Sequence, residues 1–226
     1  MNMPALRSLA EESTLERRRI ILDAAERSFT RSGFHRTTMQ DVAAEAGMSP
    51  GNLYRYFPSK DALVAGLCER DRVGLAQEFA AVKNAGGDFL AAFRDLGRRH
   101  FEDSPSNRAK AKLCLEIWAE AARNPEIAKL QDDFDRTFEE QLVEVFESAQ
   151  QQGAIHPDVN IRAVASIIGK LGDGLFVRRA TSDAFDAERE VSEVFAVIGA
   201  LLKGAIKIPE AGSGLSSSAS TQESTP

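Results

Sequence analysis

Long apolar runs, secretory signals and paired cysteines are all missing from this chain of 226 residues. No apolar stretch approaches the roughly 18 residues that a membrane-spanning helix needs, and no signal segment precedes the first expected helix. We therefore expect a soluble, cytoplasmic protein without a membrane partner. Cys68 and Cys114 sit in helical patterns without CxxC spacing, which favours thiols packed in a core over a redox switch.

The residue patterns of enzymes and metal sites are also lacking. The three histidines, His35, His100 and His156, are far apart and lack metal-ligand spacing, so we predict no metal site. The chain shows no paired catalytic carboxylates, nucleophile elbow or phosphate-binding loop. The sequence thus argues against an enzyme and predicts no cofactor.

Positive charge is scarce overall but concentrated near the N-terminus. The whole chain carries 28 basic and 34 acidic residues, a net charge of −6. Residues 14–60 hold eight basic residues against five acidic ones, so this segment alone carries +3. A locally positive module on an acidic body is suited to binding duplex DNA through the module, with an affinity that falls steeply with salt.

Within the positive segment, a helix-turn-helix pattern begins at Thr38. This threonine is placed to cap a helix that starts at Met39, with Asp41 as the acid of a capping box. Gly47 then ends the helix. A short turn that contains glycine is typical of the connection between the two helices of a helix-turn-helix.

A second helix starts immediately after this turn. Ser49 and Pro50 form an N-cap followed by a first-turn proline, and the expected helix runs to Phe57. Leu53 and Phe57, one helical turn apart, would face the core. The remaining surface, which would contact a groove and phosphates of DNA, consists of Pro50, Gly51, Asn52, Tyr54, Arg55 and Tyr56.

Two tyrosines and a lysine complete this pattern. Tyr54, Tyr56 and Phe57 cannot share one narrow face of a helix, so the tyrosines either contact phosphates or pack at the edge of the core. Ser59 caps the next helix and leaves Lys60 at a helix N-terminus, where an anion would bind. A lysine in this place is otherwise an ordinary solvated side chain.

The segment GMSPGNLYRYFPSKDALV closely resembles the end of the DNA-binding domain in TetR-family transcriptional regulators. The resemblance covers residues 14–68 and includes RRRIILDAAERSFTRSGF, whose inward-facing stripe is Ile21, Ala24, Ala25 and Phe29. It implies an all-α fold, in which an N-terminal three-helix helix-turn-helix DNA-binding domain is followed by a helical ligand-binding and dimerisation domain.

For the DNA contacts, the resemblance implies two sets of residues. Those expected on phosphates are Thr38, Tyr54, Tyr56 and Lys60. Those expected near base edges, early in the recognition helix, are Pro50, Gly51 and Asn52. Because proline and glycine have no side-chain donors, more of any sequence specificity falls on DNA shape and on Asn52, Met39, Gln40 and Arg55.

From Ser59 onward every extended segment has a helical period, which again predicts an all-α fold. We expect helices at about 59–83, 87–103, 106–123, 125–152, 160–180 and 186–206, with a possible bend or break near Gly74. Ser13 with Glu16 forms a capping box at the start of the first long helix. The Ser/Gly/Pro-rich C-terminal end has too few apolar residues to order itself. The expected domains are a mobile N-terminus (1–13), the DNA-binding domain (14–68), the ligand-binding and dimerisation domain (69–208) and a disordered tail (209–226).

The last two expected helices are candidates for a dimer interface. One recognition helix contacts few base pairs, so useful affinity normally requires two modules at a fixed spacing. Both helices have broad apolar faces, and three glycines inside the first indicate close backbone approach or a kink. The family resemblance implies a four-helix interface between two subunits, whereas an intramolecular core is the alternative. The candidate interface residues are Ile167, Ile168, Leu171, Leu175, Val194, Phe195, Ile198, Leu201 and Leu202.

Aromatic residues at helical spacing occupy the middle of the chain. Most would simply pack in the core, but the family resemblance implies that the middle helices enclose an inducer pocket. The candidate wall residues are His100, Cys114, Trp118 and Phe138, with Glu116 or Glu120 as polar groups. Aromatic rings with carboxylates would suit an organic cation, although Glu116 and Glu120, one helical turn apart, also form the pattern of a solvent-facing pair.

Together these patterns predict a sequence-specific DNA-binding transcriptional regulator. We expect a homodimeric repressor that leaves a palindromic operator when a small-molecule inducer binds. The alternative is a DNA-bound adaptor whose middle domain binds a protein partner. An accessible apolar patch without an enclosed pocket would favour the adaptor.

Overall fold

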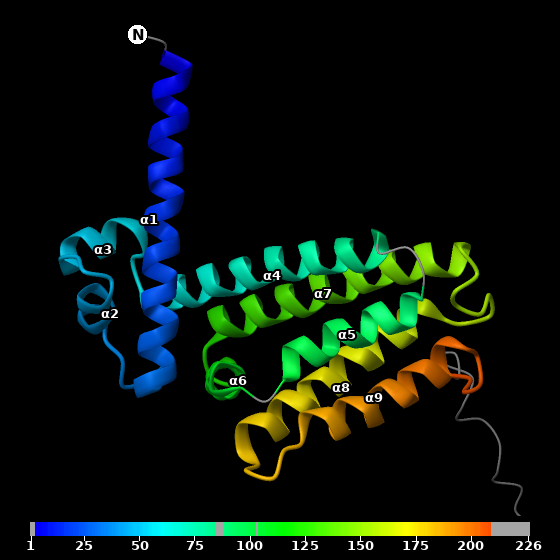
Figure 1. Ribbon diagram of the computed structural model, residues 1–226. Helices are drawn as coiled ribbons and strands as arrows, with labels where there is room; N and C mark the ends of the chain where they lie inside the picture. Colours follow the sequence, from blue (N-terminus) through cyan, green and yellow to red (C-terminus); the bar gives the residue numbers. More distant parts are fainter. Residues whose placement is uncertain (1–2, 85–87, 103, 209–226) are drawn as a thin grey trace, which may run out of the picture.

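The computed structural model of the protein describes residues 3–84, 88–102 and 104–208. All regular secondary structure within these ranges is α-helical, and none of the helices is long and apolar enough to span a membrane. In chain order the helices are α1 (Met3–Ser32), α2 (Met39–Glu45), α3 (Pro50–Tyr56), α4 (Lys60–Asn84), α5 (Phe89–Phe101), α6 (Pro105–Ala121), α7 (Pro125–Gln151), α8 (Ile161–Thr181) and α9 (Ala187–Leu202). Figure 1 shows an N-terminal module (α1–α3) at one end of an elongated body (α4–α9).

The N-terminal module packs around one small apolar core. Ile21 and Phe29 of α1 meet Val42 of α2 and Leu53 of α3, and each of these side chains is at most 1% exposed. The inward positions are those that the helical spacing predicts. The outer faces of α2 and α3 are therefore left free of core contacts.

Short-range hydrogen bonds hold the turn between α2 and α3. The Thr38 hydroxyl accepts from the Asp41 amide, and the Asp41 carboxylate accepts from the Thr38 amide, which completes the predicted capping box. Gly47 has a φ of +66°, a left-handed conformation that side chains rarely adopt. The Ser49 hydroxyl accepts from the Asn52 amide and so starts α3. The predicted helix-turn-helix is confirmed.

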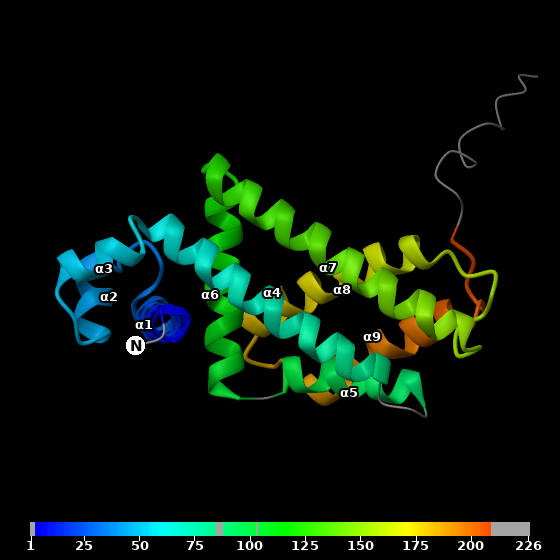
Figure 2. The same cartoon turned by 90° about the horizontal axis from the view of Figure 1, so that it is seen from above.

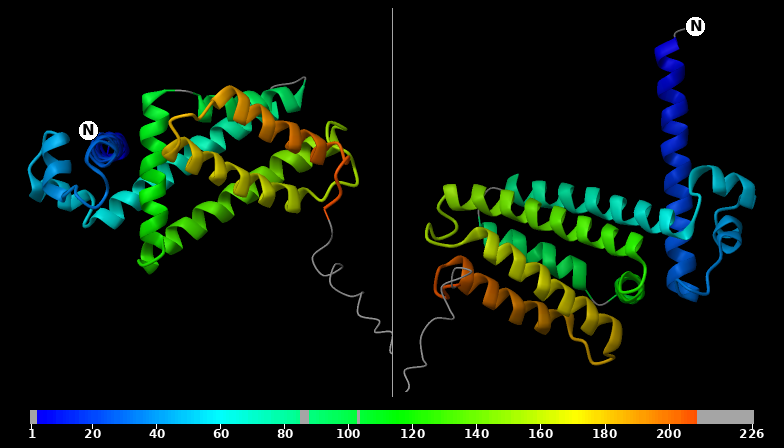
Figure 3. Two further views of the ribbon diagram at one scale, coloured as in Figure 1. Left: turned by 90° about the horizontal axis from the view of Figure 1, so that it is seen from below. Right: turned by 180° about the vertical axis from the view of Figure 1, so that it is seen from behind.

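The body is built around α4 and α7, which lie side by side along its length. Seen from above, α6 crosses this pair steeply at the end nearest the N-terminal module (Figure 2). Helix α8 packs on α6 and α7, and α9 packs on α5 and α8 (Figure 3). The side chains buried at the centre of this arrangement include Phe93, Leu142, Phe146, Val164 and Leu202.

An apolar cluster joins the N-terminal module to the body. The cluster that contains Leu53 and Phe57 extends to Leu113 of α6 and Ile127 of α7, and Ile127 is only 1% exposed. The two regions therefore share part of one core. Unfolding of the module would expose apolar surface of the body as well.

Some helix boundaries differ from those that the sequence predicted. Helix α1 already begins at Met3, ahead of the capping box expected at Ser13, and Pro4 stands in its first turn, where a proline does not interrupt a helix. Helix α4 runs unbroken through Gly74, since a single glycine costs a helix only about 1 kcal/mol relative to alanine. The predicted break at 85–87 and the predicted disordered tail at 209–226 lie outside the described residues.

Both cysteines are half-buried side chains of the body, Cys68 on α4 and Cys114 on α6. Burial raises the pKa of Cys68 to about 11 and that of Cys114 to about 12. Both groups thus remain protonated thiols near neutral pH, which favours a packing role over redox chemistry.

Candidate DNA-binding surface and ligand cavity

One face of α2 and α3 presents polar and small residues to solvent. Tyr54 leaves 44% of its surface exposed, more than a ring that packs in a core would leave. Asn52 is half-buried on the same helix. The other exposed residues among the predicted DNA contacts are Thr38, Gln40, Pro50, Gly51 and Arg55. Most of the predicted contacts are therefore accessible to solvent, and their binding to DNA remains a prediction.

Thr38 is already engaged in the capping box. Its hydroxyl donates to Asp41 Oδ2 at 2.7 Å, and its amide donates to the same oxygen at 2.8 Å. The amide hydrogen bond is the main reason that the pKa of Asp41 lies below its ordinary value. Because a hydroxyl has one proton, a phosphate contact from Thr38 would require that proton to turn away from Asp41.

Met39 does not lie on the exposed face. It is only 7% exposed, and its side chain packs in the core of the N-terminal module together with Val42. Met39 and Val42 are three residues apart, so both point inward from the same side of α2. The prediction that Met39 contributes to base recognition is therefore wrong.

Lys60 and Tyr56 have partners within the chain. Lys60 Nζ donates to the Phe34 carbonyl at 2.7 Å and lies 4.4 Å from the centre of the Phe34 ring. Tyr56 is half-buried against the apolar core, and its carbonyl accepts from Arg18 Nη1 at 3.1 Å. The Tyr56 ring thus packs at the edge of the core. A phosphate that binds Lys60 would have to share its ammonium group with the Phe34 carbonyl. Both phosphate contacts remain predictions.

The body contains a cavity of about 750 Å³. All four residues predicted to line it do so, namely His100, Cys114, Trp118 and Phe138. Its other aromatic wall residues are Phe79, Phe93, Phe101, Phe134, Phe176 and Phe195. Small-molecule sites typically measure about 300–1,000 Å³ and have mostly apolar and aromatic walls. The cavity therefore has the size and lining of such a site, and ligand binding to it remains a prediction.

Acidic side chains outnumber basic ones at the cavity wall. The carboxylates are Glu26, Asp71, Glu78, Asp135, Glu139 and Asp173, and the cations are Arg70, Lys110 and Lys170. Asp135 and Asp173 are exposed residues, but partial loss of solvent around their carboxylates at the wall is the main cause that raises the pKa of each, and the Asp173 charge raises that of Asp135 further. This charge balance favours a positively charged ligand group over a negatively charged one.

Glu116 and Glu120 lie outside the cavity wall. Glu116 Oε2 accepts from the Phe34 amide at 2.5 Å, and Glu120 Oε2 lies 3.3 Å from His35 Nε2. Both carboxylates therefore hold the loop between α1 and α2, so the prediction that either serves as a polar group of the pocket is wrong. Their spacing showed that they share a face of α6, but it could not show what lies opposite.

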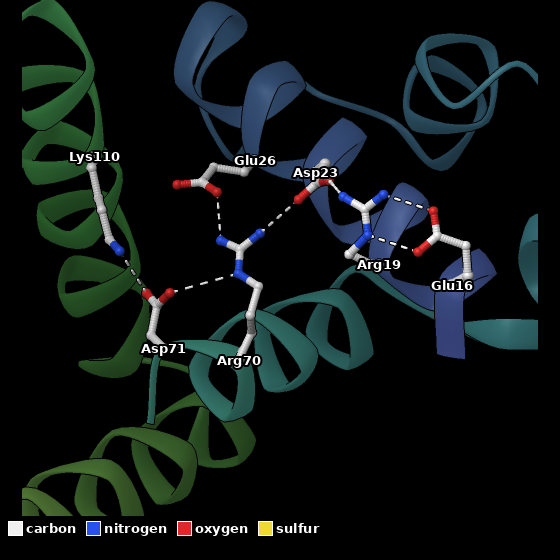
Figure 4. A network of polar contacts seen from close by, with 7 residues as sticks. All are labelled: Glu16, Arg19, Asp23, Glu26, Arg70, Asp71 and Lys110. Carbon is white, nitrogen blue, oxygen red and sulfur yellow. Dashed lines mark hydrogen bonds and ion pairs between the residues drawn. The ribbon is translucent and has the colours of Figure 1, made fainter. Parts of the chain in front are cut away.

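Sequence reasoning also missed a network of ion pairs that joins α1, α4 and α6 (Figure 4). Arg70 of α4 contacts carboxylates of α1, and the neighbouring Asp71 pairs with Lys110 of α6. One signal was available, because Lys110 precedes Cys114 and Trp118 at intervals of four residues and therefore shares their face of α6. The partners of Lys110 could not be found this way, since they lie on other helices.

Most of the predicted dimer-interface residues are used inside the chain. Five of them are at most 7% exposed, namely Ile168, Leu175, Ile198, Leu201 and Leu202. The other four are half-buried against the core of the body, namely Ile167, Leu171, Val194 and Phe195. The intramolecular alternative therefore accounts for the five buried residues, and a dimer contact by the four half-buried ones remains a prediction. Other apolar residues of α8 and α9 remain accessible, since Val177 is 38% and Val197 46% exposed.

The glycines of α8 are not explained by contacts within the chain. A Cβ atom built on Gly172 or Gly174 would meet no atom within 4 Å. Gly169 comes closest to a neighbour, with its Cβ position 3.9 Å from the Phe138 ring. Within the described residues no close backbone approach occurs at Gly172, which lines the cavity, or at Gly174, which is exposed.

Both regions of the chain match protein-family models. Residues 21–67 match the model described as "Bacterial regulatory proteins, tetR family". Residues 90–203 match "BetI-type transcriptional repressor, C-terminal". The two matches cover the N-terminal module and most of the body.

Named relatives extend over most of the chain. The HTH-type transcriptional regulator UidR of Escherichia coli K12 is 32% identical over 195 residues, which cover 80% of this chain and 91% of UidR. The HTH-type transcriptional regulator BetI of Pectobacterium carotovorum is 28% identical over 179 residues, which cover 78% of this chain and 89% of BetI. The solved structure of Salmonella enterica GusR superimposes with a TM-score of 0.71 at 29% identity and covers 84% of this chain and 96% of GusR.

Proposed function

The chain belongs to the TetR family of bacterial transcriptional regulators, and from this premise we propose that it is a homodimeric repressor released from DNA by a small molecule. The matched families and the named relatives are DNA-binding regulators and not enzymes. One observation carries the proposal: an exposed helix-turn-helix and an aromatic-lined cavity of about 750 Å³ occur in one chain. The cytoplasm, where bacterial DNA lies, is the expected location.

In this proposal α3 is the recognition helix. Its exposed Tyr54 would contact a phosphate, while Arg55 and Asn52 would lie near the major groove with Gln40 of α2. Pro50 and Gly51 offer no side-chain donors at the start of α3. Sequence preference would therefore rest on few direct hydrogen bonds and, to a larger extent, on DNA shape.

The proposed dimer interface lies on the exposed surface of α8 and α9. A palindromic operator requires two recognition helices about 34 Å apart, or a multiple of that distance, which a symmetric dimer provides. We place the interface on the exposed residues of α8 and α9, Val177 and Val197 among them, because most of the residues first predicted for it are buried within one chain. The lack of a side chain at exposed Gly174, three residues before Val177 on α8, would let a helix of the second subunit approach closely.

A ligand in the cavity would act by favouring a dimer shape whose recognition helices no longer match the operator spacing. To lower DNA affinity 100-fold, it must bind that shape better by about 2.7 kcal/mol. The coupling is reciprocal, so operator DNA must weaken ligand binding by the same factor. A confirmed ligand whose affinity does not respond to operator DNA would contradict this mechanism.

Trp118 provides a direct way to find the ligand. It is the only tryptophan of the chain and lies on the cavity wall, so its fluorescence should change when a compound enters. Compounds that change the fluorescence can then be tested for release of DNA. If the protein is instead an adaptor, no compound should both change the fluorescence and release DNA. A protein partner would then control DNA binding.

The first experiment is selection of bound fragments from a genomic duplex library, at two salt concentrations. It compares the wild-type protein with Tyr54→Ala and with a control, Ile206→Ala, which alters an exposed side chain after α9. The proposal expects an inverted repeat with the wild type and the control, and its loss with Tyr54→Ala. Recovery of no motif at either salt concentration would refute the repressor and make the adaptor the leading hypothesis.

A further inference from the structure

The N-terminal module reaches the cavity wall at a single described side chain. That side chain is Glu26 of α1, since every other described wall residue belongs to α4–α9. The Glu26 carboxylate pairs with Arg70 of α4, which also lines the cavity. The cavity and the module that carries the recognition helix therefore meet at one ion pair.

Arg70 binds two carboxylates of α1 at once. Its Nη1 lies 3.2 Å from Asp23 Oδ1, and its Nη2 donates to Glu26 Oε2. Asp23 and Glu26 are three residues apart and share a face of α1, which suits the forked donors of a guanidinium. Burial by itself would lower the pKa of Arg70, but the Glu26 hydrogen bond and the neighbouring carboxylates raise it overall. The cation is therefore permanent.

The network continues from Arg70 to α6. Arg70 Nε lies 3.7 Å from Asp71 Oδ1, and Asp71 Oδ2 lies 3.0 Å from Lys110 Nζ. Burial would lower the pKa of Lys110, but the charge of Asp71 and its hydrogen bond raise it overall. Lys110, Asp71, Arg70 and Glu26 all line the cavity, and Figure 4 shows them as one chain of contacts from α6 through α4 to α1.

This network restrains α1 differently from the apolar core. The core that includes Leu113 and Ile127 attaches the module to the body but contains no directional bonds. The ion pairs are directional and half-buried, with 29% of the Arg70 side chain exposed. A carboxylate that loses its partner in such surroundings costs more than one at an exposed site, so these groups should rearrange together.

We propose that Arg70 is the positioning residue through which an occupant of the cavity changes the angle of α1 and thereby moves the recognition helix. A ligand group at this part of the wall competes with Lys110 for Asp71, or with Arg70 for Glu26. Because α1 packs directly on α2 and shares its core with α3, a shift of α1 carries both helices. This inference rests on the proposed function for its biological meaning.

A double-mutant cycle on DNA affinity tests the inference. Lys110→Met removes a charge from the body side of the network, and Glu26→Gln removes one from the module side. Each is expected to weaken binding of the selected operator about fivefold, at the low end of ordinary coupling. The double variant should lose clearly less than the product of the two effects, because both act through Arg70.

The control is Lys112→Met, which removes the same charge from an exposed position of α6 two residues away. It is expected to bind the operator like the wild type. Equal affinities of Lys110→Met and Lys112→Met would overturn the inference. Strictly multiplicative losses for Lys110→Met and Glu26→Gln would also overturn it, since a merely structural role lowers stability without coupling the two sites.

Amide hydrogen exchange provides a second readout that needs no operator. Without DNA, Lys110→Met should speed exchange in residues 16–32 of α1, whereas Lys112→Met should not. In an Arg70→Lys background, which keeps the charge but loses the forked donors, Lys110→Met should have a smaller effect. If the wild type binds no DNA, the proposed function fails. Unchanged exchange in α1 of Lys110→Met would refute the role of the network independently of that result.

Discussion

The N-terminal module and the body are both helical, but their functional residues are brought together over very different sequence distances. In the module, the Thr38 and Ser49 hydroxyls each accept from an amide three residues further along. In the body, the cavity wall takes residues from Leu67 to Ile198 and adds Glu26 from α1. The module's surface thus follows from local bonds, whereas the cavity exists only once α1 and the six helices of the body are assembled.

The largest effect that probes this comparison is expected from Leu53→Ala. Leu53 is fully buried in the core of the module, so the truncation should lower the free energy of unfolding by about 2–5 kcal/mol. Urea unfolding at fixed protein concentration measures the loss, followed by far-ultraviolet circular dichroism and by Trp118 fluorescence. The first signal reports all helices and the second reports the body.

The two signals also test whether the regions are separate. Because the core around Leu53 extends to Leu113 and Ile127, we expect the signals to change together in one transition. A loss of helix that precedes the Trp118 change would show that the module unfolds alone. The module and the body would then be two independent folding units.

A smaller effect is expected from Gly97→Ala in the body. A Cβ atom at Gly97 of α5 would overlap the Phe195 ring of α9, so the variant should lose about 1–3 kcal/mol of stability. The matched control is Gly172→Ala, which meets open space and should be neutral or gain up to about 1 kcal/mol. Thermal unfolding measures both.

A further variant of α8, Gly174→Ala, tests the proposed dimer interface. Gly174 is exposed and a Cβ atom there meets no atom of the same chain, so the variant should be neutral in a single subunit. A loss of stability together with a lower apparent mass in sedimentation would support the close approach of a second subunit at this point. A destabilised variant of unchanged mass would contradict the open surface at Gly174.

Lys60→Ala should have a moderate effect on two quantities. Loss of the hydrogen bond to the Phe34 carbonyl should lower the free energy of unfolding by about 0.5–1.5 kcal/mol. If the lysine also contacts a phosphate, all DNA sequences should bind more weakly, and the salt dependence should become shallower by about one unit. Lys203→Ala, at an exposed position after α9, is the control. A changed sequence preference would instead place Lys60 at a base.

The smallest effect is expected from Asp173→Asn at the cavity wall. Asp173 is exposed, but partial loss of solvent at the cavity wall raises its pKa in the folded protein above its ordinary value of 3.8, so its ionised form slightly disfavours folding. The variant should therefore unfold at a slightly higher temperature at pH 7, and the gain should fade as the pH drops through the raised pKa toward 3.8. Glu140→Gln, which alters an exposed carboxylate of α7, is the control. A lower unfolding temperature at pH 7 would show that Asp173 has a favourable partner.

Helix ends were predictable because their signals are local. The expected breaks at Ser104-Pro105 and Asn124-Pro125 coincide with N-caps whose side chains accept from amides two or three residues ahead. Each cap is followed by a proline in the first turn of α6 or α7. These bonds form between neighbours in the chain, so residue types and spacing suffice to find them.

Contacts between helices were beyond the reach of the same reasoning. Spacing placed Glu116 and Glu120 on one face of α6, but only the packing of α6 beside the loop after α1 gives them Phe34 and His35 as partners. Lys60 had the position of a phosphate ligand and is engaged by a carbonyl 26 residues earlier. A periodic pattern defines a face of a helix, and it contains no information on what lies opposite.

The sequence by itself determined the helices, their caps, the helix-turn-helix surface and the aromatic residues available to a pocket. These follow from hydrogen bonds and apolar spacing within a few residues of each other. Only the tertiary structure decided that the predicted interface residues are mostly core, that Met39 is buried, and that Arg70 and Lys110 connect the cavity to α1. Those outcomes depend on which helix faces meet, and that choice is made by the packing of the whole chain.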